Sequence, residues 1–414
     1  MRSSPMVPVR LEGRRRERLL VVGGGMAALK LVEEVVVQCP GRYEIVIAAK
    51  ELHPPYNRVL LSSLLADEVQ TGDTELRPAA WYAEHGITLL GGVEACGLRP
   101  ARQEVVLATG ARLGYDRLVL ATGSKAIRLP VPGHTLPGVL TFRDLDDVGV
   151  LRAAPAGSRA VVIGGGLLGI EAAYGLVKRG IAVTLLHIMS RLMERQLDAR
   201  AAHLLKAAVE AKGIEVVLEA HTAAIEGNGK AERVVLKDGR SFPADLVIMA
   251  AGIRAETVLA ENGGIEIGRG IKVDDKLETN WPGIYAIGEC AEHRGICYGI
   301  VEPAYEQAKA LARYLSGRPA RYDGSLIAAS LKVSGVPVYS MGDFEGEGAD
   351  AIVLEDEGTG SYRKLVVRGG RLAGVVLFGD TSDAFWYRDL ILQAAPLAPI
   401  RALLAFGKAH AEAA

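Results

Sequence analysis

One glycine-rich stretch, from Ala160 to Glu171, constrains the fold of this chain more than any other. It opens with four apolar residues, Ala160 to Ile163, which predict a short buried parallel strand. A helix-prone run from Ile170 to Lys178 closes it. Between the two lie three glycines in G-x-G-x-x-G spacing, so the stretch predicts a strand, a tight turn and a helix in that order.

The three glycines, Gly164, Gly166 and Gly169, each have a distinct role in this pattern. Gly164 allows the tight turn out of the strand. Gly166 has no Cβ, so a pyrophosphate can approach the backbone, and Gly169 lets the helix pack close to the strand. The N-terminus of the helix then offers free N–H groups and a partial positive charge to phosphates. The stretch therefore predicts a dinucleotide site in an α/β fold.

A second copy of the pattern stands near the start of the chain. Leu19 to Val22 predicts a strand, Met26 to Val37 predicts a helix, and Gly23, Gly25 and Ala28 occupy the three fingerprint positions. Alanine is tolerated at the third position. Two copies make a pair of dinucleotide sites a much stronger prediction than one copy would.

An acid near the end of the strand after a fingerprint commonly binds the adenosine ribose. After the strand Glu44 to Ala48 the only candidate is Glu51, and a surface carboxylate with no ligand is an equally good alternative. The loop that follows contains two prolines and ends at Arg58, which we expect either to contact phosphate or to brace the loop.

The central fingerprint departs from the pattern at this position. Its next strand, Ala182 to Leu186, is followed by His187 where an acid is expected for NAD. A packed, satisfied histidine and a histidine facing the ribose are both open interpretations. Arg191, about one helical turn further on, is a candidate to steady a 2′-phosphate. NADH is expected to be preferred, or the discrimination to be small.

Three further strand ends carry small or acidic residues. Asp116 to Leu120 is followed by Thr122 and Gly123, whose small size lets a flat ring approach the backbone. Asp245 to Ala250 is followed by Gly252. Ile284 to Ile287 is followed by Gly288 and Glu289, and Glu289 is expected to accept hydrogen bonds from ligand hydroxyls, with a helix cap as the alternative.

The order of these motifs predicts the domain organisation. The fold class is α/β, with two Rossmann-like dinucleotide-binding domains and a small C-terminal α+β domain. If the first and last motifs serve one ligand, the central domain is inserted into the other one. We expect one domain from residues 18–128 and 254–320, the inserted domain from residues 129–253, and the third from residues 321–414, with a disordered tail over residues 1–17.

Some local elements are expected besides the fingerprints. Ile87 to Leu90 and Glu104 to Leu107 predict strands of a small sheet, and Ala304 to Leu315 predicts a helix. Towards the C-terminus, four strands are predicted and the end of the chain is predicted to be helical. The four strands are Leu331 to Met341, Ala351 to Glu355, Tyr362 to Val367 and Leu372 to Gly379.

Charge and cysteine usage narrow the function classes. The net charge of -1 gives no bulk attraction for nucleic acid or for an anionic membrane surface. No apolar run reaches the ~18 residues of a transmembrane helix. The four cysteines contain no C-x-x-C pair, so we expect no metal site, no disulfide framework and a cytoplasmic location. Cys290 is expected to be a buried, inert residue.

With these motifs in place, the chain resembles the flavoprotein reductases with two dinucleotide-binding domains, such as ferredoxin and rubredoxin reductases. Three segments narrow the resemblance to the N-terminal flavin portion of the NAD(P)H-dependent assimilatory nitrite reductase large subunit. They are Tyr56 to Arg58, Met193 to Asp198 and Cys290 to Gly295. The resemblance covers about Leu19 to Leu392 and also includes the run Leu331 to Gly335.

The resemblance implies FAD on the first fingerprint, with Thr122 and Gly123 near the flavin and Glu289 on the ribityl chain. It places NAD(P)H on the central fingerprint and a catalytic glutamate, Glu171, near the junction of the two cofactors. Related reductases often carry a lysine where this chain has Ser63. A lysine–glutamate pair is therefore not implied here. The third domain would cover the flavin face.

The expected activity is hydride transfer from NAD(P)H to FAD and onward electron transfer to a separate protein, in nitrate assimilation or a related process. Candidate acceptors are a nitrite reductase subunit, a ferredoxin and a rubredoxin, since no cysteine follows Cys297 to ligate iron–sulfur or sirohaem centres. A disulfide reductase is excluded because Leu52 to Leu65 contains no cysteine. A reductase-like, NADH-sensing interaction protein is the alternative from a different class. The oligomeric state is left open.

Overall fold

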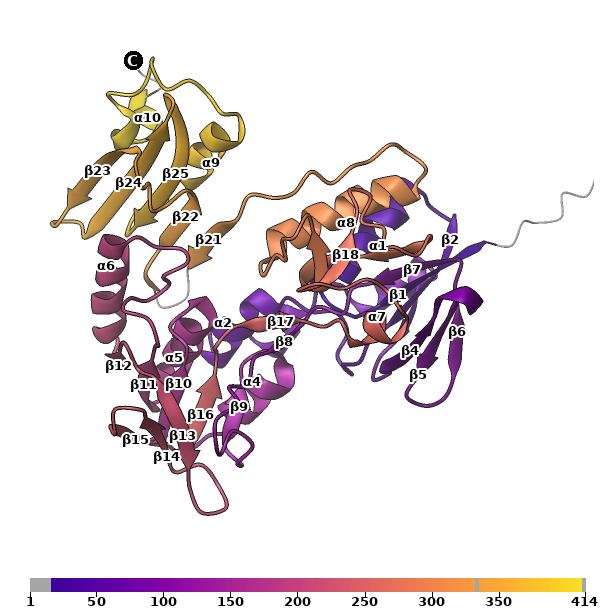
Figure 1. Ribbon diagram of the computed structural model, residues 1–414, viewed down its shortest axis with the longest axis horizontal. Helices are drawn as coiled ribbons and strands as arrows, with labels where there is room; N and C mark the ends of the chain where they lie inside the picture. Colours follow the sequence, from indigo (N-terminus) through magenta and orange to yellow (C-terminus); the bar gives the residue numbers. More distant parts are fainter. Residues whose placement is uncertain (1–15, 332–334, 412–414) are drawn as a thin grey trace, which may run out of the picture.

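The first parallel sheet is built around the strand that precedes the first glycine turn. In the computed structural model, which describes residues 16–331 and 335–411, its strand order is β19-β7-β1-β2-β3 (Figure 1). All neighbouring strands run parallel. The strands are β1 (Glu17–Val22), β2 (Tyr43–Ala48), β3 (Thr88–Leu90), β7 (Arg117–Leu120) and β19 (Ile284–Ala286). Because the chain adds β2 and β3 on one side of β1 before crossing to β7, the turn after β1 lies at the topological switch point.

Both faces of this sheet are covered, which explains why β1 reads as a continuous apolar run. Leu19 and Val21 join the core beneath α1 (Met26–Gln38) and α8 (Val301–Leu315), which lie side by side on one face (Figure 1). Leu20 joins the core on the other face. That face is covered by a small antiparallel sheet and by helix α7. These elements are β4 (Ala95–Arg99), β5 (Glu104–Leu107), β6 (Arg112–Gly114) and α7 (Val258–Asn262).

Two predictions for this part of the chain are wrong. The expected small sheet of Ile87 to Leu90 with Glu104 to Leu107 does not form, because β3 leaves α3 (Ala79–Glu84) and pairs with β2 at the edge of the main sheet. Only β5 belongs to the small sheet. The predicted tail also ends too late, since Glu17 is the first residue of β1. Residues 1–15 lie outside the described residues.

The second parallel sheet repeats the plan of the first around the central fingerprint. Its order is β12-β11-β10-β16-β9, again with all strands parallel. The strands are β9 (Val139–Thr141), β10 (Arg159–Ile163), β11 (Ala182–Leu186), β12 (Ile214–Val217) and β16 (Leu246–Met249). The turn after β10 is therefore at the switch point of this sheet.

Helices and a short antiparallel sheet surround the second sheet. The helices are α4 (Leu145–Arg152), α5 (Leu167–Lys178) and α6 (Ala199–Glu210), and the antiparallel strands are β13 (Thr222–Glu226), β14 (Arg233–Leu236) and β15 (Ser241–Pro243). Helix α5 starts three residues before the predicted Ile170, directly after Gly166. This early start matters for the site, because it places the helix N-terminus within the glycine turn.

The second unit is inserted in the first, as expected. The chain leaves the first sheet through β8 (Ser124–Ala126) and returns through β17 (Ile253–Ala255), and these two strands pair antiparallel. After the return, β18 (Ile271–Val273) pairs with β20 (Ala291–His293), and β19 completes the first sheet. A second contact joins the units where α2 (Leu61–Leu65) packs on α5. There, a Cβ on Gly175 would lie 2.8 Å from the Cγ of Leu65, so the glycine permits the close approach.

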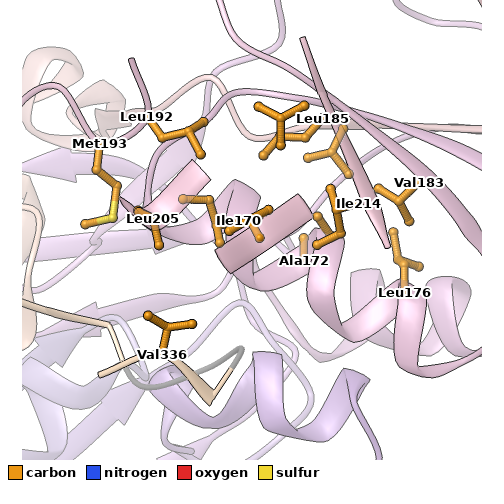
Figure 2. Close-up of a cluster of buried hydrophobic side chains, with 14 of the residues drawn as sticks. Ile170, Ala172, Leu176, Val183, Leu185, Leu192, Met193, Leu205, Ile214 and Val336 are labelled. Carbon is orange, nitrogen blue, oxygen red and sulfur yellow. The ribbon is translucent and has the colours of Figure 1, made fainter. Parts of the chain in front are cut away.

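The C-terminal unit is an antiparallel sheet that follows an extended segment, residues 319–327 (Figure 1). Its order is β21-β22-β25-β24-β23, and α9 (Ala384–Leu392) packs on β25. Val336 at its start belongs to the same buried cluster as Ile170 and Leu205 (Figure 2). The strands are β21 (Ala328–Leu331), β22 (Val338–Gly342), β23 (Asp350–Asp356), β24 (Ser361–Arg368) and β25 (Arg371–Phe378).

Two C-terminal predictions need correction. Leu331 to Met341 is not one strand, because β21 and β22 pair antiparallel with Ala328 opposite Met341. The chain reverses before β22 through Gly335 (φ = +65°) and Pro337, which has no backbone N–H to donate to a ladder. Lys332 to Ser334, part of the run that carries the resemblance, lie outside the described residues. Beyond α9 the chain is helical only in short pieces, of which the last is α10 (Lys408–Ala411).

Within residues 16–331 and 335–411, no helix combines the length and the apolar character needed to cross a membrane.

Candidate functional site

The first glycine turn combines a tight backbone contact with an open approach. Gly23 has φ = +118°, and a Cβ there would lie 2.1 Å from the carbonyl oxygen of Ala121, so only glycine fits. Gly25 is the N-cap of α1, and a Cβ there would meet no atom of the described residues within 4 Å. No side chain caps the helix. Ala28, at the third fingerprint position, is fully buried. The turn thus presents uncapped N–H groups to open space, as a pyrophosphate site requires.

Two other predicted motifs converge on this turn from distant parts of the chain. The Oγ of Ser124 donates a hydrogen bond of 2.8 Å to Oε2 of Glu289, across 165 residues of sequence. A Cβ on Gly123 would lie 3.9 Å from the same oxygen, and a Cβ on Gly288 would lie 3.0 Å from the Cβ of Ala27 in α1. The neighbouring Thr122 is fixed by its own bond to the carbonyl oxygen of Glu256, at 2.6 Å. The fingerprint, Thr122–Gly123 and Gly288–Glu289 therefore form one site.

Arg143 belongs to this site, and sequence reasoning missed it. Its guanidinium forms an ion pair with the carboxylate of Glu289, and both side chains are about four-fifths buried. Charge-assisted hydrogen bonds of this kind are stronger when shielded from water. Because the Glu289 carboxylate bonds to side chains of other elements, the helix-cap alternative is wrong. Arg143 lies in the loop before α4 and has no local motif that would have identified it.

The loop after β2 forms a braced cluster beside this site. The hydroxyl of Tyr56 donates to Oε2 of Glu51 at 2.7 Å, and the Arg58 guanidinium pairs with the other carboxylate oxygen. Arg58 also donates to the carbonyl oxygen of Arg143 at 3.0 Å and lies over the ring of Tyr56. These contacts support the loop-bracing interpretation of Arg58. A role for Glu51 on the adenosine ribose stays a prediction, because its carboxylate is already shared by these two partners.

The central glycine turn has the same geometry as the first, with a closer approach of the helix to the turn at the third fingerprint position. Gly164 has φ = +128°, and a Cβ there would lie 2.2 Å from the carbonyl oxygen of Ala250. Gly166 is the N-cap of α5 without a side-chain cap, and within the part of the chain that the structure describes no atom lies within 4 Å of its Cβ position. A Cβ on Gly169 would lie 1.8 Å from the carbonyl oxygen of Gly164, so alanine does not fit at this third position. Gly252, at φ = +111°, follows the neighbouring strand β16.

Glu171 is a buried carboxylic acid at the contact between α5 and α2. Its side chain is 8% exposed, and burial raises the pKa of the carboxyl to about 7, while the nearby hydroxyl of Ser62 opposes the rise. The Ser62 hydroxyl is itself buried and has no partner in hydrogen-bond geometry among residues 16–331 and 335–411. The hydroxyl that approaches Glu171 therefore belongs to Ser62, one residue before Ser63. A neutral neighbour leaves the desolvation of the carboxylate uncompensated.

His187 is buried against the central glycine turn. The backbone N–H of Gly165 donates to Nδ1 of His187 at 3.0 Å, and Nε2 lies 3.0 Å from Oε2 of Glu194. Both ring nitrogens are thus satisfied by protein atoms, which supports the packed interpretation. The nearby cation, Arg191, forms an ion pair with Glu345 of the C-terminal unit. Glu194 lies in the run that carries the family resemblance, but its contact with His187 is visible only in the structure.

Cys290 has no feature of a reactive thiol. The residue is fully buried, and burial raises the pKa of its thiol above the ordinary value of 9.0. Its Sγ donates to the carbonyl oxygens of Leu120 and Ile287. The expectation of a buried residue is confirmed, and a neutral thiol in this setting is a poor nucleophile.

Comparisons with known proteins agree with two dinucleotide sites and a separate C-terminal unit. The pyridine nucleotide-disulphide oxidoreductase family profile matches residues 17–310. The profile of the rubredoxin NAD+ reductase C-terminal domain matches residues 328–395. The first match spans both glycine turns, and the second spans the antiparallel sheet.

Two curated proteins of Bacillus subtilis (strain 168) are similar over most of this chain. The assimilatory nitrate reductase electron transfer subunit is 43% identical over 382 residues, which cover 92% of this chain and 50% of that protein. The NAD(P)H nitrite reductase is 44% identical over 371 residues, which cover 89% of this chain and 46% of that protein. The chain therefore spans about half the length of both relatives.

A solved structure resembles the chain over almost its full length. The crystal structure of the covalent putidaredoxin reductase–putidaredoxin complex superimposes with a TM-score of 0.84 at 27% identity. The superposition covers 92% of this chain and 94% of that chain. The three structural units are thus found together in a reductase that was crystallised with its redox protein.

Proposed function

The chain belongs to the pyridine nucleotide-disulphide oxidoreductase family, and from this premise we propose that it is a flavoprotein reductase. It takes electrons from NAD(P)H, passes them through FAD and delivers them to a separate redox protein. The observation that carries this proposal is the pair of glycine turns, each with an uncapped helix N-terminus and an open Cβ position. These two turns stand on two sheets joined by the β8–β17 pair.

The residues of the first site fit FAD. Gly23 and Gly25 form the opening for the pyrophosphate, and the Cβ that Gly25 lacks would fill it. Thr122 and Gly123 leave room for a flat ring, and Glu289 supplies a carboxylate for ribityl hydroxyls. Arg143 holds that carboxylate in place by its ion pair. Ribose binding by Glu51 and phosphate binding by Arg58 are further proposals at this site.

The residues of the second site fit NAD(P)H in the same way. Gly164, Gly166 and Gly169 provide the turn, the opening and the close packing of α5 on β10. When bound, FAD supplies the hydride acceptor and the ability to release electrons one at a time. The task of the chain is to bind and orient the two cofactors and to exclude water from their contact.

Glu171 is our candidate for a proton-holding group near that contact. It is the buried carboxyl of α5, and its pKa of about 7 leaves it partly protonated near neutral pH. A group with such a pKa can hold or release a proton without a large energetic cost. Its position at the α2–α5 contact supports a role between the two units, because α2 lies in the first part of the chain and α5 in the inserted part.

We further propose the functional limits of each unit. The FAD unit comprises residues 18–128 and 254–320, the NAD(P)H unit residues 129–253, and the C-terminal unit residues 321–414. The paired strands β8 and β17 support the two internal boundaries, since the chain crosses between the sheets there. We place the protein in the cytoplasm, where NAD(P)H is available and where its four free cysteines stay reduced.

The proposed acceptor is a protein that reduces nitrite or nitrate. The names of the two Bacillus relatives support this acceptor, because one is an electron transfer subunit of nitrate reductase and the other is a nitrite reductase. A ferredoxin or a rubredoxin is the second candidate. The match of the C-terminal unit to a rubredoxin reductase domain and the likeness to a putidaredoxin reductase complex support it.

The test is NADH oxidation by the FAD-loaded protein with and without each candidate acceptor protein. We expect slow oxidation alone and fast oxidation with the true acceptor, with nitrite converted only when its reductase is present. Ammonium formed from nitrite by the chain alone contradicts a separate acceptor. Slow turnover with every acceptor and a long-lived reduced complex support the NADH-sensing alternative instead.

A further inference from the structure

We propose that Glu194, oriented by His187, makes the second site selective for NADH over NADPH. Its carboxylate accepts a hydrogen bond from the adenosine 2′-hydroxyl of NADH and repels the 2′-phosphate of NADPH. This inference rests on the proposed function and adds to it which of the two nucleotides the site takes.

The loop after β11 is built directly onto the central glycine turn. A Cβ on Gly165 would lie 2.7 Å from the Cγ of His187 and 2.6 Å from the Cδ2 of Leu192, so these side chains contact the turn itself. The backbone N–H of Met193 also donates to the carbonyl oxygen of Gly165 at 3.0 Å. The end of the strand after a fingerprint is where the adenosine ribose lies in this fold. The loop that carries Glu194 therefore borders the ribose position.

Two hydrogen bonds define how His187 holds Glu194. Nδ1 of His187 accepts from the backbone N–H of Gly165, so the ring proton is on Nε2. Nε2 then donates to Oε2 of Glu194 at 3.0 Å. The histidine at the expected acid position therefore does not replace the acid. It connects the glycine turn to an acid seven residues further along the chain.

The backbone around Glu194 is fixed as well. The side chains of Leu192 and Met193 lie in the same buried cluster as Leu185 and Leu205 (Figure 2). Met193 has φ = +49°, a left-handed conformation that a residue with a side chain adopts only when its surroundings enforce it. With this turn, Leu192 and Met193 are buried while the side chain of Glu194 stays 25% exposed.

Glu194 retains one carboxylate oxygen for a ligand. Oε2 accepts a hydrogen bond from His187, whereas Oε1 lies 3.9 Å from the Nε of Arg195, too far for a hydrogen bond. The side chain of Arg195 is 85% exposed, and that of Glu194 is 25% exposed. The carboxylate is thus partly desolvated, reachable from solvent and oriented, as the acceptor of a ribose hydroxyl needs to be.

The cation that would favour a 2′-phosphate is already engaged. Arg191 forms an ion pair with Glu345 and also donates to the carbonyl oxygen of Glu194 at 3.4 Å. Its Nε is buried away from solvent. A carboxylate that faces the ribose and a neutralised arginine both disfavour the doubly charged phosphate, since like charges at close range cost affinity.

The experiment is isothermal titration of the FAD-loaded protein with NAD+ and with NADP+, which needs no turnover. For the wild type we expect NAD+ to bind at least about tenfold more tightly than NADP+. Glu194→Gln removes the charge and keeps the shape, so the ratio should fall to within about threefold, mainly through tighter NADP+ binding. Glu345→Gln frees Arg191 and should raise NADP+ affinity by no more than about fivefold, because solvent partly screens the ion pair, whose side chains are 30% and 41% exposed.

Two further variants separate selectivity from structural damage. Glu210→Gln makes the same chemical change on the exposed end of α6 and should leave the ratio unchanged. His187→Asn keeps a partner for the Gly165 N–H but is too short to reach Glu194, so NAD+ affinity should fall more than NADP+ affinity. If His187 had a purely structural role, His187→Asn would lower the affinity for NAD+ and for NADP+ by the same factor.

The outcomes distinguish this inference from the proposed function. If NADP+ binds as tightly as NAD+ to the wild type, or if Glu194→Gln leaves the ratio unchanged, the role of Glu194 is wrong while the second site stands. If neither nucleotide binds the FAD-loaded protein, the proposed function itself fails.

Discussion

Glu171→Gln tests whether the buried carboxyl of Glu171, at the contact between α2 and α5, is held in its neutral form. The carboxyl is 8% exposed and its pKa lies at about 7 instead of 4.5, chiefly because burial disfavours the charged form. Glutamine has nearly the same shape and does not titrate in this range. The variant therefore removes the charge on Glu171 and little else.

The sign and size of the effect follow from proton linkage. Between pH 4.5 and about 7 the folded chain holds a proton that the unfolded chain releases, so the stability present below pH 4.5 is lost as the pH rises through the folded pKa. At about 1.4 kcal/mol per pKa unit, the shift of the Glu171 pKa from 4.5 to about 7 lowers the free energy of unfolding by about 3 kcal/mol. The difference in free energy of unfolding between Glu171→Gln and the wild type should thus rise by about 3 kcal/mol in favour of the variant as the pH increases from about 4.5 to about 8.

The assay is urea unfolding of the wild type and of Glu171→Gln across this pH range. The free energy of unfolding is taken from the same unfolding transition in both proteins. Glu210→Gln, an exposed change on α6, serves as the control for general effects of charge removal. A difference between Glu171→Gln and wild type that stays constant with pH would refute the reasoning, because Glu171 would then titrate at its ordinary value. A difference that changes only below pH 4.5 would refute it equally.

The remaining predictions concern the two open glycine positions. Gly25→Val should fold, because its Cβ position is free of protein atoms, but should lose most of its FAD, as measured by flavin absorbance per chain. If the folded variant kept its full FAD content, the first turn would not be part of the FAD site. Gly166→Val should keep its FAD and lose binding of NADH, as measured by titration of the yellow protein. If Gly166→Val bound NADH as tightly as the wild type does, the central turn would not be part of the nucleotide site.

The fold was predictable where its determinants are local. Each fingerprint combines a buried strand, glycines at fixed spacing and a helix, and all three parts lie within about a dozen residues. The structure confirms the strand, turn and helix of both copies, and Gly23 and Gly164 both have a positive φ. The insertion of one unit in the other was also predictable, because the motif order along the chain carries that information.

The errors have a common physical cause, which is that strand partners and side-chain partners are chosen across the chain. The short run at β3 gives no local sign that it joins β2 rather than β5. The sequence predicts one strand where β21 and β22 pair antiparallel, because the apolar pattern continues from one to the other and only Gly335 and Pro337 interrupt it.

The same limitation applies to the site. Arg143 meets Glu289 across 146 residues, and Glu345 meets Arg191 across 154 residues. No motif marks either pair. His187 was recognised as a departure from the expected acid, but its partner Glu194 was not, since the contact depends on the left-handed turn at Met193. Sequence patterns predicted the two glycine turns, and the structure was needed to find the ion pairs and hydrogen bonds beside them.

The most direct test of the central claim is anaerobic mixing of the FAD-loaded protein with NADH, followed by addition of the acceptor protein, while the visible flavin absorbance is recorded. We expect loss of the flavin absorbance on addition of NADH and its recovery on addition of a nitrite- or nitrate-reducing protein, a ferredoxin or a rubredoxin. Flavin absorbance that NADH does not change, or that recovers with none of these proteins, would contradict it.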